Sequence, residues 1–169
     1  KESSLDFIKG ADIVIWTTTP WTIPANKALA YNAGLKYVLI EVNDDKNFIN
    51  RKIVIAKDLL EPFKKDTSIK KVNVIEEFSG KEFTNTICSH PFSELGYDYD
   101  IPMLEANFVT TEQGTGIVHC APSHGPDDFN LCINNNIKAI ETVDGDGKYT
   151  NEIKIFEGLH IFKANNLII

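Results

Sequence analysis

The sequence has few cysteines and no apolar run long enough to cross a membrane. Its three cysteines, Cys88, Cys120 and Cys132, are odd in number and lack C-x-x-C spacing, which disfavours a disulfide framework or a zinc knot. Apolar stretches fall short of the roughly 18 residues that a spanning helix needs. An opening Met and a charged-then-apolar leader are also missing. We therefore expect a soluble protein, or a piece of a longer one, in the reducing cytoplasm.

An excess of basic residues is missing as well. Lys and Arg number 17 against 24 Asp and Glu, so the formal net charge is −7. Non-specific affinity for nucleic acid comes from cations that neutralise several phosphates. The one basic concentration, Lys64, Lys65, Lys70 and Lys71, is typical of a solvated helix end and loop. We expect this chain alone to bind any nucleic acid weakly, through the end of the nucleic acid.

Short β-rich runs recur at fairly even spacing, which favours a sheet or barrel over a helical bundle. They are Asp12–Trp16, Tyr37–Val42, Lys52–Ile55, Lys71–Glu76, Phe108–Thr111 and Gly116–Cys120. The helical candidates are Pro24–Ala30, Lys57–Lys64 and a helix that follows Gly125, with Pro126 in first position. A length of 169 residues with 43% apolar residues predicts a single domain, residues 1–169, with short helices at the edges of a β core.

The segment Asp144–Thr150 imitates a calcium loop, because its aspartates fall at alternate positions. An EF-hand needs Gly at its sixth position and Glu at its twelfth, where this chain has Tyr149 and Ile155. The segment therefore predicts a hairpin turn.

A threonine-rich segment begins where the first strand is expected to end. Pro20 removes a backbone donor and pushes Thr19 towards an extended conformation, so the sheet must stop near this point. The hydroxyls of Thr17–Thr19 then lie at an opening, where they can hold a ribose, a carbonyl or a water molecule. A threonine run at a strand end is also ordinary strand sequence, and Trp21 could equally belong to the core.

A second segment, Gly114–Asp128, combines glycines, histidines and two aspartates. Two glycines without a third are no dinucleotide fingerprint. His119 and Cys120 are neighbours on a strand, so their side chains point to opposite faces and cannot act as a nucleophile and base. A thiol protease is therefore a poor interpretation.

The same segment ends at the start of the helix expected after Gly125. Asp127 and Asp128 fall in its first turn, where the helix dipole favours an ionised carboxylate that can hold a cation. The alternative is that they only stabilise the start of the helix, as acidic residues commonly do. His119 and His124 match no zinc spacing, so we expect no metal.

Together the two segments resemble the connective-peptide editing domain that isoleucyl-, valyl- and leucyl-tRNA synthetases share. The first carries T-T-x-P-x-T at Thr17–Thr22, and the second carries G-T-G-x-V-H-x-A-P-x-H-G-x-D-D at Gly114–Asp128. The valyl and leucyl branches usually have Arg at the position of Thr19, so the stretch from Thr17 to Asn26 is most similar to the isoleucyl branch. Cys120 departs from the Thr of many relatives.

This resemblance implies a mainly β fold, a distorted closed β-barrel with a few short peripheral helices. It also implies one editing domain excised from a larger synthetase. The H-I-G-H and K-M-S-K-S signatures with which the parent enzymes handle ATP are absent from the sequence. We therefore expect no aminoacylation by this chain and no cofactor.

The resemblance further implies roles for individual residues, with Asp128 pairing with the substrate's α-ammonium. The catalytic set is Thr18, Thr19, His119 and Asp128. The substrate-binding set is Thr17, Trp21, Thr22, Asn26 and again Asp128. In this scheme His119 borders the side-chain pocket and Trp21 forms an apolar wall.

The implied activity is editing, in which a positioned water hydrolyses valine from isoleucine tRNA while isoleucine is excluded by size. Valyl-adenylate is a second substrate that the resemblance allows. The expected partners are the 3′ end of the mischarged tRNA and the rest of the synthetase, with no membrane. Two other classes stay open: a catalytically silent module that binds tRNA 3′ ends, and an unrelated β-barrel hydrolase. The sequence does not fix which group takes the proton from water.

Overall fold

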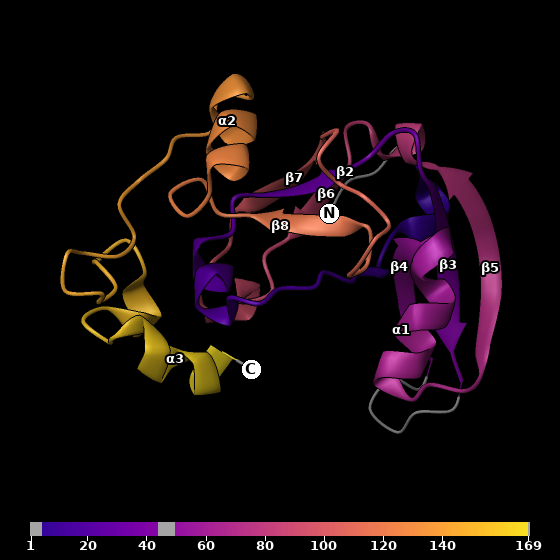
Figure 1. Ribbon diagram of the computed structural model, residues 1–169, viewed down its shortest axis with the longest axis horizontal. Helices are drawn as coiled ribbons and strands as arrows, with labels where there is room; N and C mark the ends of the chain where they lie inside the picture. The colour runs from indigo at the N-terminus through magenta and orange to yellow at the C-terminus, as the bar shows by residue number, and fades with distance from the viewer. Residues whose placement is uncertain (1–4, 44–49, 169) are drawn as a thin grey trace. The chain divides into compact units, whose positions relative to one another are not determined.

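The computed structural model describes residues 5–43 and 50–168, which are mainly β with few helices (Figure 1). The strands are β1 (Asp12–Ile13), β2 (Ala28–Tyr31), β3 (Lys36–Val42), β4 (Lys52–Ala56), β5 (Val72–Ser79), β6 (Ile87–Ser89), β7 (Asp100–Glu105) and β8 (Ile117–Cys120). The α-helices are α1 (Leu60–Thr67), α2 (Pro126–Asn134) and α3 (Ile161–Ile168). The strands form two four-stranded sheets, in the orders β1-β4-β3-β5 and β6-β7-β2-β8.

The chain divides into two compact units, and each is described by itself. Unit 1 takes the described residues of Lys1–Trp16, Leu29–Cys88 and Pro102–Val118. Unit 2 takes those of Thr17–Ala28, Ser89–Ile101 and His119–Ile169. The threonine segment and the end of the second motif, from His119 onwards, therefore belong to the same unit.

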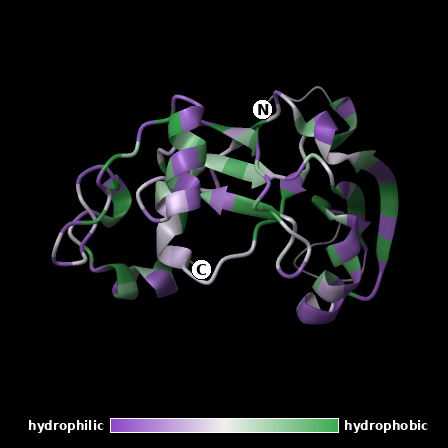
Figure 2. Cartoon of the chain, turned by 45° about the horizontal axis from the view of Figure 1, so that its top comes forward, coloured by the Kyte–Doolittle hydropathy of each residue, from purple (hydrophilic) through white to green (hydrophobic). Residues whose placement is uncertain are grey.

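The sheet of unit 1 is built around β3, which is buried along almost its whole length. It pairs antiparallel with β4 and β5, while the short β1 runs parallel to β4. Bulky residues on both faces of β3, such as Leu39 and Ile40, explain why this strand lies inside the sheet. The register with β5 shifts between Leu39 and Ile40. β5 is an exposed edge strand along which hydrophilic and hydrophobic residues are interspersed (Figure 2).

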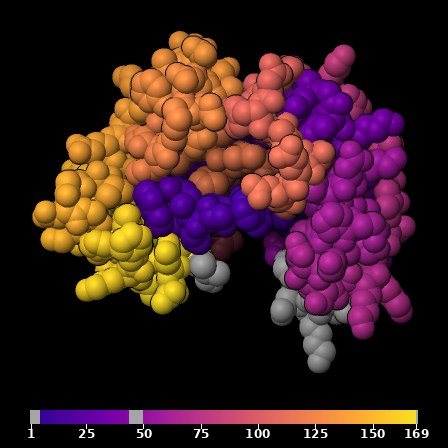
Figure 3. All heavy atoms as spheres, in the orientation of Figure 1, coloured from indigo at the N-terminus to yellow at the C-terminus, as the bar shows by residue number. Residues whose placement is uncertain are grey.

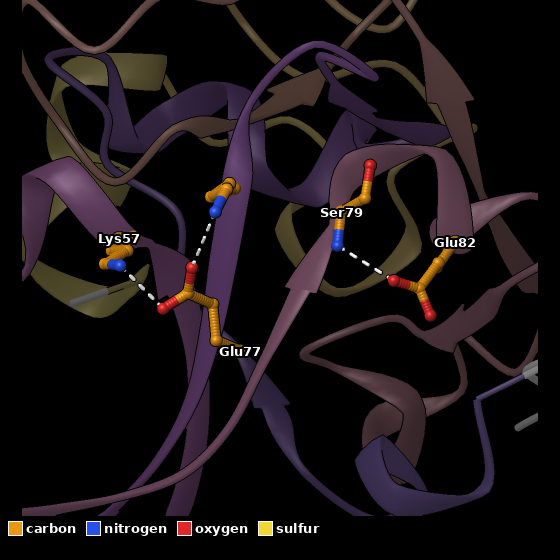
Figure 4. Close-up of polar contacts among 5 residues, drawn as sticks. Lys57, Glu77, Ser79 and Glu82 are labelled. Carbon is orange, nitrogen blue, oxygen red and sulfur yellow. Dashed lines mark hydrogen bonds and ion pairs between the residues drawn. The ribbon is translucent and has the colours of Figure 1, made fainter.

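Polar contacts fix the end of β5. The Glu77 carboxylate accepts hydrogen bonds from Lys57 at 2.6 Å and Lys36 at 3.1 Å, and these bonds, the one from Lys57 first, lower its pKa (Figure 4). Ser79 and Glu82 form a capping box for the turn that follows the strand (Figure 4). These contacts link the exposed β5 to Lys36 of β3, to Lys57 and to the turn that follows the strand.

A buried tyrosine ties this sheet to the chain that leads into β8. The Tyr37 hydroxyl donates to the carbonyl of Gly116 at 2.9 Å, and burial raises the pKa of Tyr37 to about 12. Gly116 has a φ of +73°, and a Cβ at this position would lie 2.3 Å from the Cβ of Ala56. Only glycine fits here, which gives the second glycine of the motif a packing role.

Unit 2 has its own small core, formed by the buried side chains of Ala25, Ala121, Tyr149, Ile153, Phe156 and Ala164. The core residue Ala121 follows β8 directly, and the next residues lead into α2, whose atoms lie at the surface in Figure 3. The hairpin expected at Asp144–Thr150 is confirmed, because Val143 and Tyr149 form an antiparallel bridge and the Gly147 N–H donates to the Asp144 carbonyl.

The expected closed barrel is wrong. Among residues 5–43 and 50–168, no pairing joins β1 to β5 or β6 to β8, so each sheet keeps two edges. Each sheet also contains a parallel pair, β1 with β4 and β2 with β7, which connects segments distant in sequence. Local patterns carry no information on such pairings, and so the sequence indicated strands but not their closure.

Two expected elements are also wrong. Pro24–Ala30 is not a helix: a 3-10 turn covers Pro20–Ala25, and β2 begins at Ala28. Pro24 cannot donate a helical hydrogen bond, and burial of β2 outweighs the helical propensity of its alanines. Phe108–Thr111 is not a strand but a loop, in which the Val109 carbonyl accepts a hydrogen bond from the Asn32 side chain.

The remaining expected elements are confirmed with shifted ends. β3, β4, β5 and β8 lie close to the predicted ranges, whereas β1 is only the first part of Asp12–Trp16. The helix expected at Lys57–Lys64 is a 3-10 turn at Lys57–Leu59 followed by α1. The α2 helix begins with Gly125 as N-cap and Pro126 in the first turn, as expected.

Replacing Gly116 with alanine tests the close packing against Ala56. Gly10 is the matched control, because its φ of +78° is as unfavourable for alanine but nothing lies within 4 Å of the added Cβ. Gly10→Ala should lower the free energy of unfolding by about 1–2 kcal/mol through backbone strain alone. Gly116→Ala should cost about 1–3 kcal/mol more through overpacking. Chemical denaturation measures both, and equal losses would contradict the close contact.

Candidate functional site

The end of β8 connects the two motif segments through hydrogen bonds within unit 2. Nε2 of His119 lies 3.1 Å from Oγ1 of Thr22. The next residue, Cys120, donates its backbone N–H to Oδ1 of Asn26 at 3.3 Å. Its carbonyl accepts the N–H of Lys27 at 2.9 Å. The threonine segment is thereby fixed to the strand by side-chain and backbone bonds.

Asp128, which follows this stretch in the sequence, is also bonded to it. Its Oδ2 accepts the backbone N–H of Ala121 at 2.9 Å, so the first turn of α2 folds back onto the end of β8. Burial raises the pKa of Asp128, the Ala121 N–H acts against this shift, and the negative charge of Asp127 adds to it. Asp127 itself is exposed. The geometry therefore separates two neighbouring aspartates that the sequence could not distinguish without the motif.

The threonine segment forms a compact hydroxyl network. Oγ1 of Thr17 accepts the N–H of Thr19 at 3.0 Å and lies 3.3 Å from the Thr19 hydroxyl. The Thr22 hydroxyl donates to the Thr19 carbonyl at 2.8 Å. The 3-10 turn that carries Thr22 begins at Pro20, directly after Thr19. Thr18 and Thr19 are exposed. The exposed Thr19 thus contacts the buried Thr22.

His119 is buried and uncharged at neutral pH. Burial is the main reason that its pKa is lowered to about 4, and the nearby His124 adds to the effect. His119 contacts the threonine turn through Thr22, whereas the side chain of the adjacent Cys120 is completely buried. Adjacent side chains alternate between the two faces of a strand, so His119 and Cys120 point to opposite sides.

Trp21 lies partly in the core of unit 2. Its indole meets the His124 ring edge-on with 4.9 Å between ring centres, and its carbonyl accepts the hydroxyl of Tyr149 at 2.6 Å. Trp21 is half-buried, so it packs against the unit 2 core while part of its surface stays accessible.

A hollow of about 780 Å³ opens beside the start of α2. Its walls are Pro122–Pro126, Phe129 and residues 139–143. Within it, His124 Nε2 lies 2.6 Å from Oγ1 of the buried Thr142. Nothing in the sequence indicated that residues 139–143 line this hollow, because they show neither helical nor strand periodicity.

Sequence reasoning also missed His90, which lies in a stretch without a recognisable pattern. It is buried, its Nε2–H donates to the carbonyl of Ile23 at 3.1 Å, and its Nδ1 accepts the N–H of Phe92 at 3.0 Å. Tyr97 stacks on its ring at 4.8 Å. His90 thereby fixes the 3-10 turn that carries Thr22, and only its three-dimensional partners reveal this role.

Two further properties concern only the part of the chain that the structure describes. No group of three or more His, Cys, Asp or Glu residues there is arranged to hold a metal ion. No helix there has the length and apolar character needed to cross a membrane.

Sequence comparison identifies a matching family model and similar proteins. The family model described as "Leucyl-tRNA synthetase, editing domain" matches residues 10–164. An isoleucine–tRNA ligase of Pelagibacter ubique strain HTCC1062 is 66% identical over 169 residues, which are 100% of this chain and 19% of that protein. An isoleucine–tRNA ligase of Gluconobacter oxydans strain 621H is 43% identical over 161 residues, which are 93% of this chain and 17% of that protein. The chain thus spans less than a fifth of the length of these relatives.

Structural comparison gives the same type of domain. The editing domain of P. falciparum cytosolic leucyl-tRNA synthetase in space group P1 matches with a TM-score of 0.67 at 14% identity, covering 96% of this chain and 77% of that one. The corresponding P. knowlesi domain matches with a TM-score of 0.62 at 13% identity, covering 96% and 82%. At such identities the similarity establishes the fold alone.

The buried His90 should make stability depend on pH. Its pKa is lowered from 6.5 to about 4, chiefly by burial, so between these values the unfolded chain binds a proton that the folded chain does not. The free energy of unfolding should therefore fall as the pH falls from 6.5 to 4, by roughly 3 kcal/mol for this group. His90→Gln should flatten the slope by about 1.4 kcal/mol per pH unit in denaturation experiments. Identical slopes for the two proteins would contradict a neutral, buried His90.

Proposed function

This chain belongs to the family of aminoacyl-tRNA synthetase editing domains, and on that premise we propose that it hydrolyses valine wrongly attached to isoleucine tRNA. Proofreading is the general role of such a domain. The choice of valine and isoleucine tRNA rests on the two isoleucine–tRNA ligases to which the chain is similar over nearly its whole length. Because the chain corresponds to a small part of those proteins, we propose the tRNA and the rest of such a ligase as its partners.

The physical need for such a reaction follows from the size of the two amino acids. A pocket that accepts isoleucine cannot exclude valine strongly, because one methylene is worth about 1–3 kcal/mol, a limit for which isoleucyl-tRNA synthetases are themselves the standard example. A second site can use size in the opposite direction, since valine enters where isoleucine clashes. Editing requires such a site beside a hydrolytic centre.

The observation that carries the proposal is the set of bonds at residues 119–121. Through them Thr22 is bonded to the His119 side chain, and Asn26 and Asp128 to the backbone N–H groups of the next two residues. Asp128 uses Oδ2 for the Ala121 N–H, and we assign its other oxygen to the α-ammonium of valine. The arriving cation would favour the charged carboxylate, which burial alone disfavours.

We assign the hydroxyls of the threonine segment to the reacting end of the substrate. Thr17, Thr18 and Thr19 would hydrogen-bond the terminal ribose, the ester carbonyl and the attacking water. Water adds to the carbonyl carbon, the ester C–O bond breaks, and the ribose oxygen leaves with a proton. The ester is already activated, so orientation of water is sufficient and no covalent intermediate is needed. There are two candidates for handling the proton, the adjacent ribose hydroxyl and His119, and the lowered pKa of His119 makes it a weak base at neutral pH.

The buried members of the set have supporting and selecting roles in this proposal. Thr22 and Asn26 hold the strand end, and their burial fits a role in positioning better than direct contact with substrate. His119 borders the side-chain pocket and excludes isoleucine by its bulk, while Trp21 supplies an apolar wall. Valyl-adenylate carries the same ammonium and acyl group, so the same residues would accept it as a second substrate.

Replacing Asp128 tests the ammonium contact, and Asp127 is the matched control one residue away in the same helix turn. Asp128→Ala should reduce deacylation of valyl-tRNA by about a hundredfold or more, because a charge-assisted contact to the substrate is lost. Asp127→Ala, which removes an exposed carboxylate, should retain most activity. Deacylation of radiolabelled valyl-tRNA measures both. Near-normal hydrolysis by Asp128→Ala would remove Asp128 from this role, and inactivity of the unmodified chain would favour a silent tRNA-end binding module.

Replacing His119 tests size exclusion. His119→Ala should begin to hydrolyse correctly charged isoleucyl-tRNA, with the preference for valine reduced by about tenfold. His160→Ala is the control, because this histidine of unit 2 instead accepts the Phe162 N–H in α3. Rates on the two aminoacyl-tRNAs are compared for each protein. Unchanged discrimination in His119→Ala would show that another residue excludes isoleucine.

A further inference from the structure

We propose that Thr22 acts as a positioning residue that fixes the tautomer of His119, so that His119 Nδ1 accepts a hydrogen bond from an O–H donor at the reacting end of the substrate. The tautomer follows from contacts within unit 2. The identity of the donor rests on the proposed editing function. The donor is either the attacking water or the free ribose hydroxyl, which share the same hydrogen-bond chemistry.

The first step counts the hydrogens around Thr22. A threonine hydroxyl has one hydrogen. Oγ1 of Thr22 lies 2.8 Å from the Thr19 carbonyl, which also accepts the Thr22 N–H, and 3.4 Å from Oγ1 of Thr19. We assign the hydrogen to the shortest contact, the Thr19 carbonyl. The contact of 3.1 Å between Thr22 Oγ1 and His119 Nε2 therefore needs its hydrogen from the imidazole. With this assignment His119 carries its proton on Nε2, and Oγ1 of Thr22 accepts the hydrogen bond from that N–H.

The second step concerns the other ring nitrogen. Because burial keeps His119 neutral, a proton on Nε2 leaves Nδ1 with a bare lone pair. His119 is 9% exposed, and Nδ1 is buried without a partner among the described residues. A buried acceptor without a donor is costly, and a donor that enters with the substrate would remove that cost.

His90 provides an internal comparison. It is also buried in unit 2, and it also carries its proton on Nε2, which donates to the Ile23 carbonyl. Its Nδ1, however, accepts the Phe92 N–H at 3.0 Å, so both of its nitrogens are used within the fold. The two histidines share a tautomer, but only His119 keeps an acceptor for a partner from outside.

The chemical consequence is orientation of the donor rather than removal of its proton. A nitrogen with a pKa of about 4 is a weak base at neutral pH. It can still accept a hydrogen bond and direct the oxygen lone pair of the donor towards the ester carbonyl. In the opposite tautomer an N–H would face the same donor and repel it.

Nitrogen-15 NMR of the histidine side chains tests the tautomer directly. The unmodified chain should show His119 protonated on Nε2. Thr22→Val, which keeps the shape but removes the acceptor, should mix or invert the tautomers of His119, whereas Thr22→Ser should preserve them. His90 should be unchanged in all three proteins, which controls for folding. A proton on Nδ1 in the unmodified chain, or an unchanged tautomer in Thr22→Val, would overturn the proposal.

Two activity measurements complete the test. On valyl-tRNA, Thr22→Val should lower kcat about tenfold with little change in KM, and Thr22→Ser should restore the rate. A normal kcat for Thr22→Val would refute the positioning role. If the unmodified chain hydrolyses no aminoacyl ester although His119 has the expected tautomer, the proposed function fails while the tautomer assignment holds.

The source of the donor is identified with a non-hydrolysable amide-linked valyl-adenosine analogue. Binding should move the His119 Nδ1 resonance in the direction that accepting a hydrogen bond produces. If an analogue that lacks the free ribose hydroxyl gives the same shift, the donor is water; if the shift is lost, the donor is the ribose hydroxyl. Binding of both analogues without any Nδ1 shift would overturn the proposed contact.

Discussion

The site depends on how the backbone at the end of β8 satisfies its hydrogen bonds. Where a strand leaves its sheet, N–H groups lose their ladder partners and need others if they are buried. Here the N–H groups of Cys120 and Ala121 are taken by the side chains of Asn26 and Asp128. The same requirement that completes the fold thus fixes both motif segments.

Burial shifts the pKa values of Asp128 and His119 in opposite directions, and in both cases it favours the neutral form. It raises the pKa of Asp128 and lowers that of His119. A cation that binds Asp128 reverses the first shift, whereas a neutral O–H donor at His119 needs no charge on the imidazole. The two groups therefore suit different parts of an aminoacyl ester, the ammonium and the hydroxyl end.

The motifs and the strongest strands could be predicted from the sequence, because both depend on local residue types. The buried β3 and β4 follow from their β-branched runs, and α2 follows from Gly125 and Pro126. The sheet pairings could not be predicted, since β2 pairs with β7 across a long stretch of sequence. For the site, the motif indicated Asp128, but His90 carries no signal of its own until Ile23 and Phe92 are seen beside it.

The charge of the chain explains how such a site can be selective without strong binding. A net charge of −7 and an acidic first turn in α2 repel a phosphate backbone, so this chain gains little from the bulk of a tRNA. In the proposed function, recognition must then come from the aminoacyl end, where the side chain is the part that differs between correctly and incorrectly charged tRNA. In the proposed function, the rest of the ligase would supply the grip on the tRNA. Weak binding by the editing part would let a correctly charged end leave before it is hydrolysed.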